Sequence, residues 1–439
     1  MTIKVKNLNF AYHQKDIFKD VNFSLPTGSF TLLTGSNGSG KSTLLKLIAH
    51  LLPAGKAIVR PKNWTMVFQD PTSHFVMPTA LEELIFSLEN LNISPTHAKK
   101  KITQVATALH LTSLLNQPLQ TLSSGEKQRV SFAIAAIMEP DLLLLDEAFS
   151  NCDPSSRKLL LKQLLEFKKR GTTIVAIDHQ TQGYENLVTH QLTIKNKGIH
   201  FTPFALPVAK LSKKALSLPT PKNKIFTLSN FSLSLSQKTL LNNVTNYIPQ
   251  GITLLTGENG SGKSAFFNSL IKMMPYQGHL LYQEKEVRKL RQKKYLTTVG
   301  EVFTDSTPQF LKLTAAAEIA TARRKTKFFS QKEIDQMIKE LNLPDLDQSI
   351  YTLSGGQKKK LQILLMLLEN HRVLLLDEPL TGLDCDSQQL VCKWLKKSAR
   401  SKNIVIISHQ VGPLSEIINY HLHLKDQNLV FESSLNLES

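Results

Sequence analysis

The chain has few cysteines and tryptophans, no long apolar run, and fewer acidic than basic residues. Its three cysteines, Cys152, Cys385 and Cys392, have no metal-ligand spacing, which argues against a zinc site or a disulfide framework. No stretch approaches the roughly 20 apolar residues that span a bilayer, and the N-terminus lacks the apolar stretch of a secretory signal. We therefore expect a cytosolic protein, and 439 residues suit two domains, each with its own core.

The excess of basic residues predicts an acidic partner without identifying it. The chain has 53 Lys and Arg but only 35 Asp and Glu, which gives a net charge of +18. Basic clusters occur at residues 99–101, 168–170, 323–327 and 358–360. Such clusters suit anionic lipid or nucleic acid, and they are equally compatible with solvated helix faces.

One glycine-rich sequence occurs twice in the chain. Residues 35–42 read GSNGSGKS and residues 257–264 read GENGSGKS, and both fit the phosphate-loop pattern G-x-x-x-x-G-K-[ST]. Each follows the apolar run TLLTG and precedes a helix-prone segment, which is the strand–loop–helix context that the motif needs. Later landmarks recur at nearly the same interval, so the sequence predicts a duplicated domain.

These loops predict two sites for ATP and Mg²⁺. Backbone amides of such a loop cradle phosphate oxygens, and its lysine reaches the β- and γ-phosphates. The loop residues expected to bind nucleotide are Gly35, Ser36, Asn37, Gly38, Ser39, Gly40, Lys41, Ser42 and Thr43 in the first copy, and Gly257, Glu258, Asn259, Gly260, Ser261, Gly262, Lys263, Ser264 and Ala265 in the second.

Acidic residues at the ends of two apolar runs complete the predicted chemistry. LLLLDE ends at Glu147 and LLLDE ends at Glu378. Asp146 and Asp377 are expected to hold Mg²⁺ together with the hydroxyls of the two loop serines, Ser42 and Ser264. Glu147 and Glu378 follow directly and are expected to orient or deprotonate an attacking water. The alternative for each acid is an ordinary carboxylate at the end of a strand.

Two further stretches resemble the signature of ABC ATPases, namely LSSGEKQR at 122–129 and LSGGQKKK at 353–360. With the D-loops at 151–153 and 382–384 and the histidines His179 and His409, the resemblance covers nearly the whole chain. It implies an α/β fold of two tandem P-loop NTPase domains. Each domain would have a mostly parallel core sheet, an antiparallel β subdomain and a helical subdomain that carries the signature.

The resemblance also implies where the pieces act. We expect a first domain at 1–200, a proline-containing linker at 201–224 and a second domain at 225–439. Each ATP would lie between one half's phosphate loop and the other half's signature, and His179 and His409 would contact the γ-phosphate. The signature residues expected to bind nucleotide are Ser123, Ser124, Gly125, Glu126, Ser354, Gly355, Gly356 and Gln357.

The two halves differ in ways that predict unequal sites. The first has Tyr12 to stack on adenine and Gln69 to sense Mg²⁺ and water, where alignment places Leu235 and Thr304 in the second. The first signature also carries Ser124 in place of a glycine. We therefore expect the site with Glu147 to hydrolyse ATP faster, unless a neighbouring ring such as Phe231 replaces the missing tyrosine.

Residues 67–86, VFQDPTSHFVMPTALEELIF, resemble the corresponding segment of energy-coupling factor (ECF) ATPases, and residues 314–319 form a diverged second copy. The resemblance implies a peripheral protein on the cytoplasmic face of the cell membrane. Its partners would be a transmembrane scaffold and a small substrate-binding membrane protein that import a vitamin, a metal ion or a precursor, and no homodimer is required. The chain departs from the pattern at His74, and the second copy lacks the glutamine and the proline.

Two alternatives remain open on the sequence. The chain also fits the ATPase of a generic ABC importer. ABC-F proteins, which bind ribosomes, likewise carry two ATPase halves in one basic chain, but they normally have a long charged helical linker. Residues 201–224 hold four prolines and no such helix pair, so nucleic acid is the less expected partner.

Overall fold

The computed structural model describes the chain in two compact units, residues 1–210 and 211–439. Its described residues are all except 1, 13–14, 37, 74, 150–151, 153, 179–182, 196, 205–215, 222, 236–237, 259, 304–308, 344 and 436–439. Each unit is built around one six-stranded sheet and is described by itself below.

The central sheet of the first unit has the strand order β5-β6-β7-β3-β8-β9. Its first five strands run parallel, and only β9 is antiparallel to its neighbour. Strands β6 and β7 are buried along their whole length, as their unbroken apolar sequences predict for a sheet covered on both faces. The strands are β3 (Phe30–Thr34), β5 (Trp64–Val67), β6 (Leu142–Asp146), β7 (Thr173–Ile177), β8 (His190–Lys195) and β9 (Gly198–Pro203).

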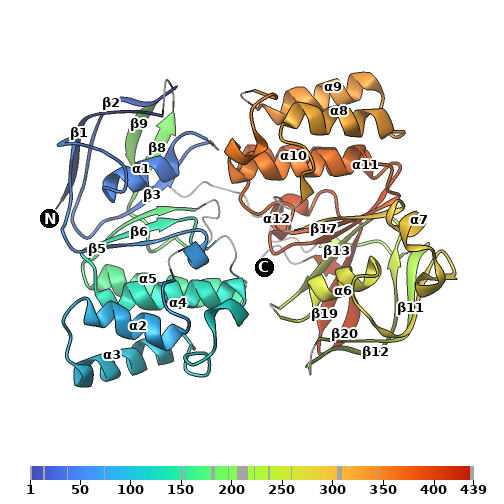
Figure 1. The fold of residues 1–439 in the computed structure, drawn as a ribbon, viewed down its shortest axis with the longest axis horizontal. Helices are drawn as coiled ribbons and strands as arrows, with labels where there is room; N and C mark the ends of the chain where they lie inside the picture. The colour runs from blue at the N-terminus through green and yellow to red at the C-terminus, as the bar shows by residue number, and fades with distance from the viewer. Residues whose placement is uncertain are drawn as a thin grey trace. The chain divides into compact units, whose positions relative to one another are not determined.

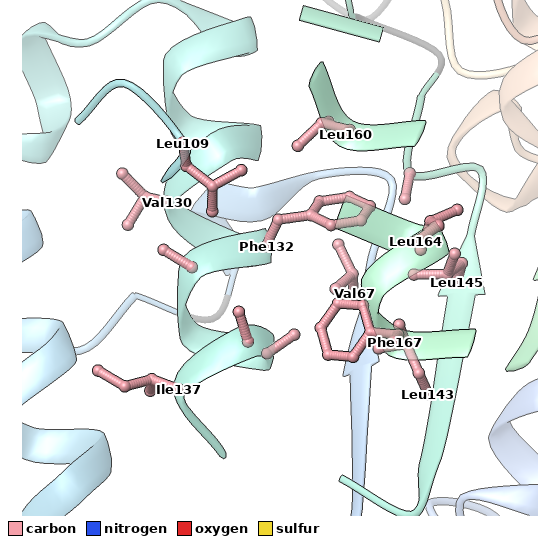
Figure 2. Close-up of a cluster of buried hydrophobic side chains, with 14 of the residues drawn as sticks. Val67, Leu109, Val130, Phe132, Ile137, Leu143, Leu145, Leu160, Leu164 and Phe167 are labelled. Atoms are coloured by element: carbon pink, nitrogen blue, oxygen red, sulfur yellow. The ribbon is translucent and has the colours of Figure 1, made fainter. Parts of the chain in front are cut away.

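The two faces of this sheet carry different layers. One face packs against α1 (Lys41–Ile48) and a three-stranded antiparallel sheet of β1 (Ile3–Tyr12), β2 (Lys15–Leu25) and β4 (Ile58–Val59). The other face packs against α2 (Ala80–Glu89), α3 (Pro95–Ala108), α4 (Ser124–Met138) and α5 (Pro154–Lys169). Figure 2 shows side chains of this second core, among them Phe132 of α4, Phe167 of α5, and Leu143 and Leu145 of β6. Short 3₁₀ turns occur at Pro71–Ser73 and Leu119–Thr121.

The second unit repeats this plan. Its central sheet has the order β16-β17-β18-β13-β19-β20, again parallel except for the last pair. The strands are β13 (Ile252–Gly257), β16 (Val299–Val302), β17 (Val373–Asp377), β18 (Asn403–Ile407), β19 (Tyr420–Lys425) and β20 (Asn428–Glu432). A four-stranded antiparallel sheet is formed by β11 (Lys224–Leu235), β12 (Lys238–Pro249), β14 (Gln277–Tyr282) and β15 (Lys285–Glu286).

Most helices of the second unit correspond to helices of the first. Figure 1 shows α8 and α9 lying against α10, which forms the helical layer of this unit. Its helices are α6 (Lys263–Leu270), α7 (Gln292–Leu296), α8 (Ala315–Lys325), α9 (Gln331–Leu341), α10 (Gly355–Leu368), α11 (Cys385–Ser398) and α12 (Val411–Leu414), with 3₁₀ turns at Val287–Lys289 and Ile350–Thr352. Together with the homologous plan of the first unit, this arrangement confirms the predicted α/β fold.

The segment between the units is only partly described. Strand β9 continues to Pro203, so the predicted boundary after residue 200 falls inside a strand. Strand β10 (Leu216–Ser217), near the end of the predicted linker, pairs with β21 (Ser434–Leu435) close to the C-terminus. The domain boundaries themselves stay a prediction. Within the described ranges, none of the helices combines the length and apolar character that crossing a membrane requires.

Candidate functional site

The first phosphate loop joins β3 to α1 and holds its lysine against its own backbone. Lys41 Nζ donates to Gly35 O at 2.8 Å and to Ser36 O at 3.2 Å, and the side chain is buried. Gly40 caps α1 with a φ of 103°, and a Cβ there would lie 2.6 Å from Cγ2 of Ile17. Only glycine fits this position without strain.

The second loop has the same geometry between β13 and α6. Lys263 Nζ donates to Gly257 O at 2.7 Å and to Glu258 O at 2.9 Å. Gly262 caps α6 with a φ of 102°. Gly38 and Gly260 also have positive φ in the two loops, and Thr43 and Ala265 lie in the first turns of the two helices. Asn37 and Asn259 lie outside the described residues.

Both loops keep a buried hydroxyl that suits an oxygen-rich ligand. Ser39 Oγ and Ser261 Oγ occupy the same position of the two loops, and neither has a hydrogen-bond partner among the described residues. Buried polar groups are usually satisfied, so an orphaned hydroxyl beside backbone amides at a helix N-terminus fits a bound phosphate.

A serine hydroxyl and a strand-end carboxylate meet beside each loop. Ser42 Oγ donates to Asp146 Oδ1 at 2.9 Å, and Ser264 Oγ donates to Asp377 Oδ2 at 2.9 Å. Hard oxygen donors of this kind fit Mg²⁺, so the residues present fit the predicted metal. Burial raises the pKa of Asp146 to about 6, although the hydrogen bond from Ser42 acts in the opposite direction.

The two glutamates that follow adopt an unusual backbone conformation. Glu147 and Glu378 have φ values of 49° and 48°, and their N–H groups donate to Ile177 O and Ile407 O of the neighbouring strands. Left-handed backbone is uncommon for glutamate, and both halves adopt it at the same position. Gln69 Nε2 donates to Glu147 Oε2 at 2.9 Å, which brings two predicted site residues together.

In the second unit, Glu378 lies against the predicted switch histidine. His409 Nε2 is 3.7 Å from Glu378 Oε1, and the His409 N–H donates to Glu378 Oε2 at 3.4 Å. Burial, followed by the charge of Asp377, raises the pKa of Glu378 to about 7. The corresponding His179, like Thr304, lies outside the described residues.

Each signature forms the start of a long helix. Ser123 caps α4 and Ser354 caps α10, each in a capping box with the residue three positions later, Glu126 or Gln357. Ser124 and Gly125 open α4, as Gly355 and Gly356 open α10. The N–H groups at these helix starts suit an anion.

Two segments of the chain, residues 18–150 and 241–381, match the ABC transporter family and together cover more than half of it. The chain belongs to the ABC transporter family. It is therefore an ATP-binding ATPase with two ABC segments, and the sequence prediction of an ABC ATPase is confirmed.

Similar proteins span nearly the whole chain. A Bacillus subtilis (strain 168) ATP-binding protein named for HMP/thiamine import is 28% identical, over 98% of this chain and 91% of that protein. An ABC transporter ATP-binding protein of Treponema denticola is 27% identical, over 98% and 96%. The structure of an RNase-L inhibitor matches with a TM-score of 0.70 at 18% identity, covering 95% of this chain and 87% of that one, which supports the fold alone.

The ABC ATPase differs between its halves at the predicted adenine contact. Tyr12 is 43% exposed at the end of β1, and Leu235 is 56% exposed at the equivalent end of β11. Phe231, considered above as a substitute ring, is fully buried and stacks on Tyr276 with ring centroids 5.1 Å apart. Phe231 is therefore not the substitute ring, because it belongs to the core and presents no face to a ligand.

Two buried glutamates of the ABC ATPase were missed by sequence reasoning. Glu83 Oε1 accepts the N–H groups of Val76 and of Met77, the latter at 2.7 Å. Glu318 Oε1 accepts the N–H groups of Leu311 and Lys312 in the same way. The available signal was the acid four residues after Thr79 and Thr314 in TALEEL and TAAAEI.

A third buried glutamate, Glu301, distinguishes the second half. Glu301 of β16 pairs with Leu375 of β17, as Met66 of β5 pairs with Leu144 of β6. Burial, followed by the charge of Asp377, raises the pKa of Glu301 to about 8. Its Oε2 has no hydrogen-bond partner within the described part of the chain. A glutamate inside the apolar run VGEVF was the signal in the sequence.

Proposed function

We propose that this chain is the energy-coupling ATPase of an ECF-type membrane importer for a vitamin, a metal ion or a related micronutrient. The observation that carries the proposal is an apolar segment held on the surface of each half by a buried glutamate. The relative named for HMP/thiamine import supports the import direction and a small-molecule substrate.

The two apolar segments are exposed yet fixed in place. Val76 is 69% exposed, and Leu311 and Leu313 are 86% and 71% exposed. Their backbone is anchored by Glu83 and Glu318, which lie on α2 and α8 and are themselves buried. Burying a carboxylate costs free energy, and here it fixes apolar side chains that remain exposed to solvent. An exposed apolar segment that is held in place in this way is characteristic of a docking surface. We assign this surface to a short helix of the transmembrane scaffold.

Nucleotide chemistry would power the movement of that partner. Lys41 and Lys263 would bind the β- and γ-phosphates of ATP, with each signature completing the site of the other half. Mg²⁺, when bound by Ser42 with Asp146 or by Ser264 with Asp377, would neutralise charge on the phosphates. Glu147 would orient the attacking water and accept its proton, and Gln69, which contacts Glu147, would relay the state of the nucleotide to the segment at Val76.

The proposal includes unequal hydrolysis. Glu147→Gln is expected to abolish most single-turnover hydrolysis of ATP, because it removes the proton acceptor next to Gln69. Glu378→Gln is expected to reduce it much less, because the second half lacks the tyrosine and glutamine of the first. Equal losses in the two variants would contradict unequal sites, without touching the membrane assignment.

Partners and location follow from the same proposal. We place the chain at the cytoplasmic face of the membrane, with a transmembrane scaffold and a small substrate-binding membrane protein as partners. The basic surface would favour anionic lipid over nucleic acid.

Purification of the tagged chain from its own cells in mild detergent tests the proposal. Stoichiometric integral membrane proteins are expected to accompany it. Ribosomal proteins and RNA that persist at high salt would instead support the ribosome-associated alternative. Val76→Asp with Leu311→Asp should release the membrane proteins, whereas Val430→Asp, at an exposed valine on β20, should retain them.

A further inference from the structure

The two signatures form the same helix cap but differ in charge at its third position, Glu126 in the first and Gln357 in the second. Ser123 N donates to Glu126 Oε2 at 2.8 Å, and Ser354 N donates to Gln357 Oε1 at 2.9 Å. In return, Glu126 N donates to Ser123 Oγ at 3.3 Å, and Gln357 N donates to Ser354 Oγ at 3.3 Å. Both helices therefore begin with the same reciprocal cap.

The hydroxyl groups of the two cap serines, Ser123 and Ser354, differ in whether they donate a hydrogen bond. Ser123 Oγ lies 2.7 Å from Glu126 Oε2. An ionised carboxylate only accepts hydrogen bonds, so the single hydroxyl proton of Ser123 is donated to Glu126. In the second signature the Ser354 hydroxyl proton has no acceptor among the described residues. It therefore stays available to an incoming oxygen.

Glu126 also places negative charge where an anion is expected. Ser123 is exposed at the N-terminus of the 15-residue helix α4, a position whose N–H groups attract anions. The nearest ion-pair partner of Glu126 is Arg129 Nη2, at 3.9 Å from Oε1. The Nη1 group of Arg129 is engaged by the backbone oxygens of Leu109 and His110. Arg129 therefore offsets the Glu126 charge only in part.

Steric exclusion does not account for the difference between the signatures. A Cβ added at Gly355, the residue of α10 that corresponds to Ser124, would meet nothing within 4 Å. Gly355 also has no positive φ that would require glycine. The fold therefore tolerates a larger residue at this position, and Glu126, in the same first turn of α4, adds a charge that Gln357 lacks.

We propose that Glu126 is a specificity-determining residue that competes with the terminal phosphate of ATP for the Ser123 hydroxyl. The first signature is thereby the weaker acceptor of a triphosphate, whereas the second, with neutral Gln357, closes readily on one. The inference rests on the proposed pairing of each signature with the phosphate loop of the other half. On this inference, the difference in ATP affinity between the two sites is caused by one residue, Glu126 in the first signature and Gln357 in the second.

The chain offers a reciprocal exchange as the test, Glu126→Gln against Gln357→Glu. Lys41→Ala restricts binding to the second loop, and Lys263→Ala restricts it to the first. Glu126→Gln with Lys41→Ala is expected to tighten binding of a non-hydrolysable ATP analogue about tenfold. Gln357→Glu with Lys263→Ala should weaken it by a similar factor. Both exchanges preserve the cap, so the midpoint of thermal unfolding should be unchanged.

ADP and a serine variant separate competition from a structural effect. ADP lacks the terminal phosphate, so its affinity should hardly respond to Glu126→Gln. Ser123→Ala should remove most of the gain, because no hydroxyl remains to be competed for. Unchanged affinity for the ATP analogue, or an equal gain for ADP, would overturn the inference. Neither result would alter which membrane proteins co-purify with the chain. Co-purification therefore tests the transporter proposal independently of this inference.

Discussion

Single glycines decide whether the phosphate loops close. At Gly40 an added Cβ would lie 2.6 Å from Ile17 and 3.0 Å from Phe18, at a φ of 103°. At Gly38, with a φ of 79°, it would meet nothing within 4 Å. We expect Gly40→Ala to lower the free energy of unfolding by about 2–4 kcal/mol and Gly38→Ala by only about 1 kcal/mol. Urea unfolding measures both, and equal losses would show that the contact with Ile17 and Phe18 is unimportant.

The acid at position 301 predicts a dependence of stability on pH. The pKa of Glu301 is raised from 4.5 to about 8, so the folded state holds this proton more tightly than the unfolded chain. Its contribution to stability is complete below about pH 4.5 and is lost as the pH rises towards 8. Glu301→Met, which introduces the residue of the first half, should therefore stabilise the second unit by about 2 kcal/mol or more at pH 8.

The same Glu301→Met variant should show a smaller gain at pH 5, where the carboxyl is protonated in the folded chain. Denaturant titrations at the two pH values give the comparison. A gain that is the same at both would mean that the side chain stabilises through packing alone, with no contribution from its ionisation.

At the scale of elements, two helices hold the proposed docking segments through one carboxylate each. Glu83→Ala should remove the acceptor of the partly buried N–H groups of Val76 and Met77, at a total cost of about 1–3 kcal/mol. Hydrogen exchange at these two amides should accelerate strongly. Glu82→Gln, which alters only the cap of the same helix at Thr79, serves as the control. Slow exchange at residues 76–77 in Glu83→Ala would disprove the anchoring role.

Elements with strong local signals were predictable from the sequence. The phosphate loops, the capping box at Ser330 and the apolar strands ending at Asp146 and Asp377 have local causes, namely glycine, helix caps and unbroken apolar runs. The catalytic and binding roles of the site residues remain predictions from the sequence. The contact of Gln69 with Glu147 depends on strand order, which no local pattern encodes, and so it emerged only from the fold. The contact of Glu83 with the Val76 N–H is local, and the acid that follows Thr79 was its signal in the sequence. Phe231 was misjudged because sequence proximity does not reveal which face of a strand is buried.

At the scale of the whole molecule, net charge overstates the basic surface. Within the cluster at 358–360, Lys359 and Lys360 are buried, and their ammonium groups donate to Phe303 O and Leu341 O. Lys99 and Lys100 on α3 are exposed and remain available for an anionic surface. The charge that reaches a partner is therefore smaller than +18 suggests.

That exposed charge predicts salt-sensitive binding to membranes. The purified chain should sediment with vesicles that contain about 30% anionic lipid, and the bound fraction should fall severalfold between about 50 mM and about 500 mM salt. Vesicles of neutral lipid are the control. A bound fraction that does not change with salt concentration, or that is the same on neutral vesicles, would contradict an electrostatic contribution to membrane association.

The reciprocal caps at Ser123 and Ser354 have an evolutionary consequence. Glutamate and glutamine close the helix start equally well, so an exchange between them leaves folding almost untouched while changing the charge offered to a nucleotide. Selection for a stable fold therefore does not act against that exchange. After duplication, one half could therefore drift in its nucleotide chemistry without passing through an unstable ancestor, and a single nucleotide change in a glutamate or glutamine codon would suffice for each step.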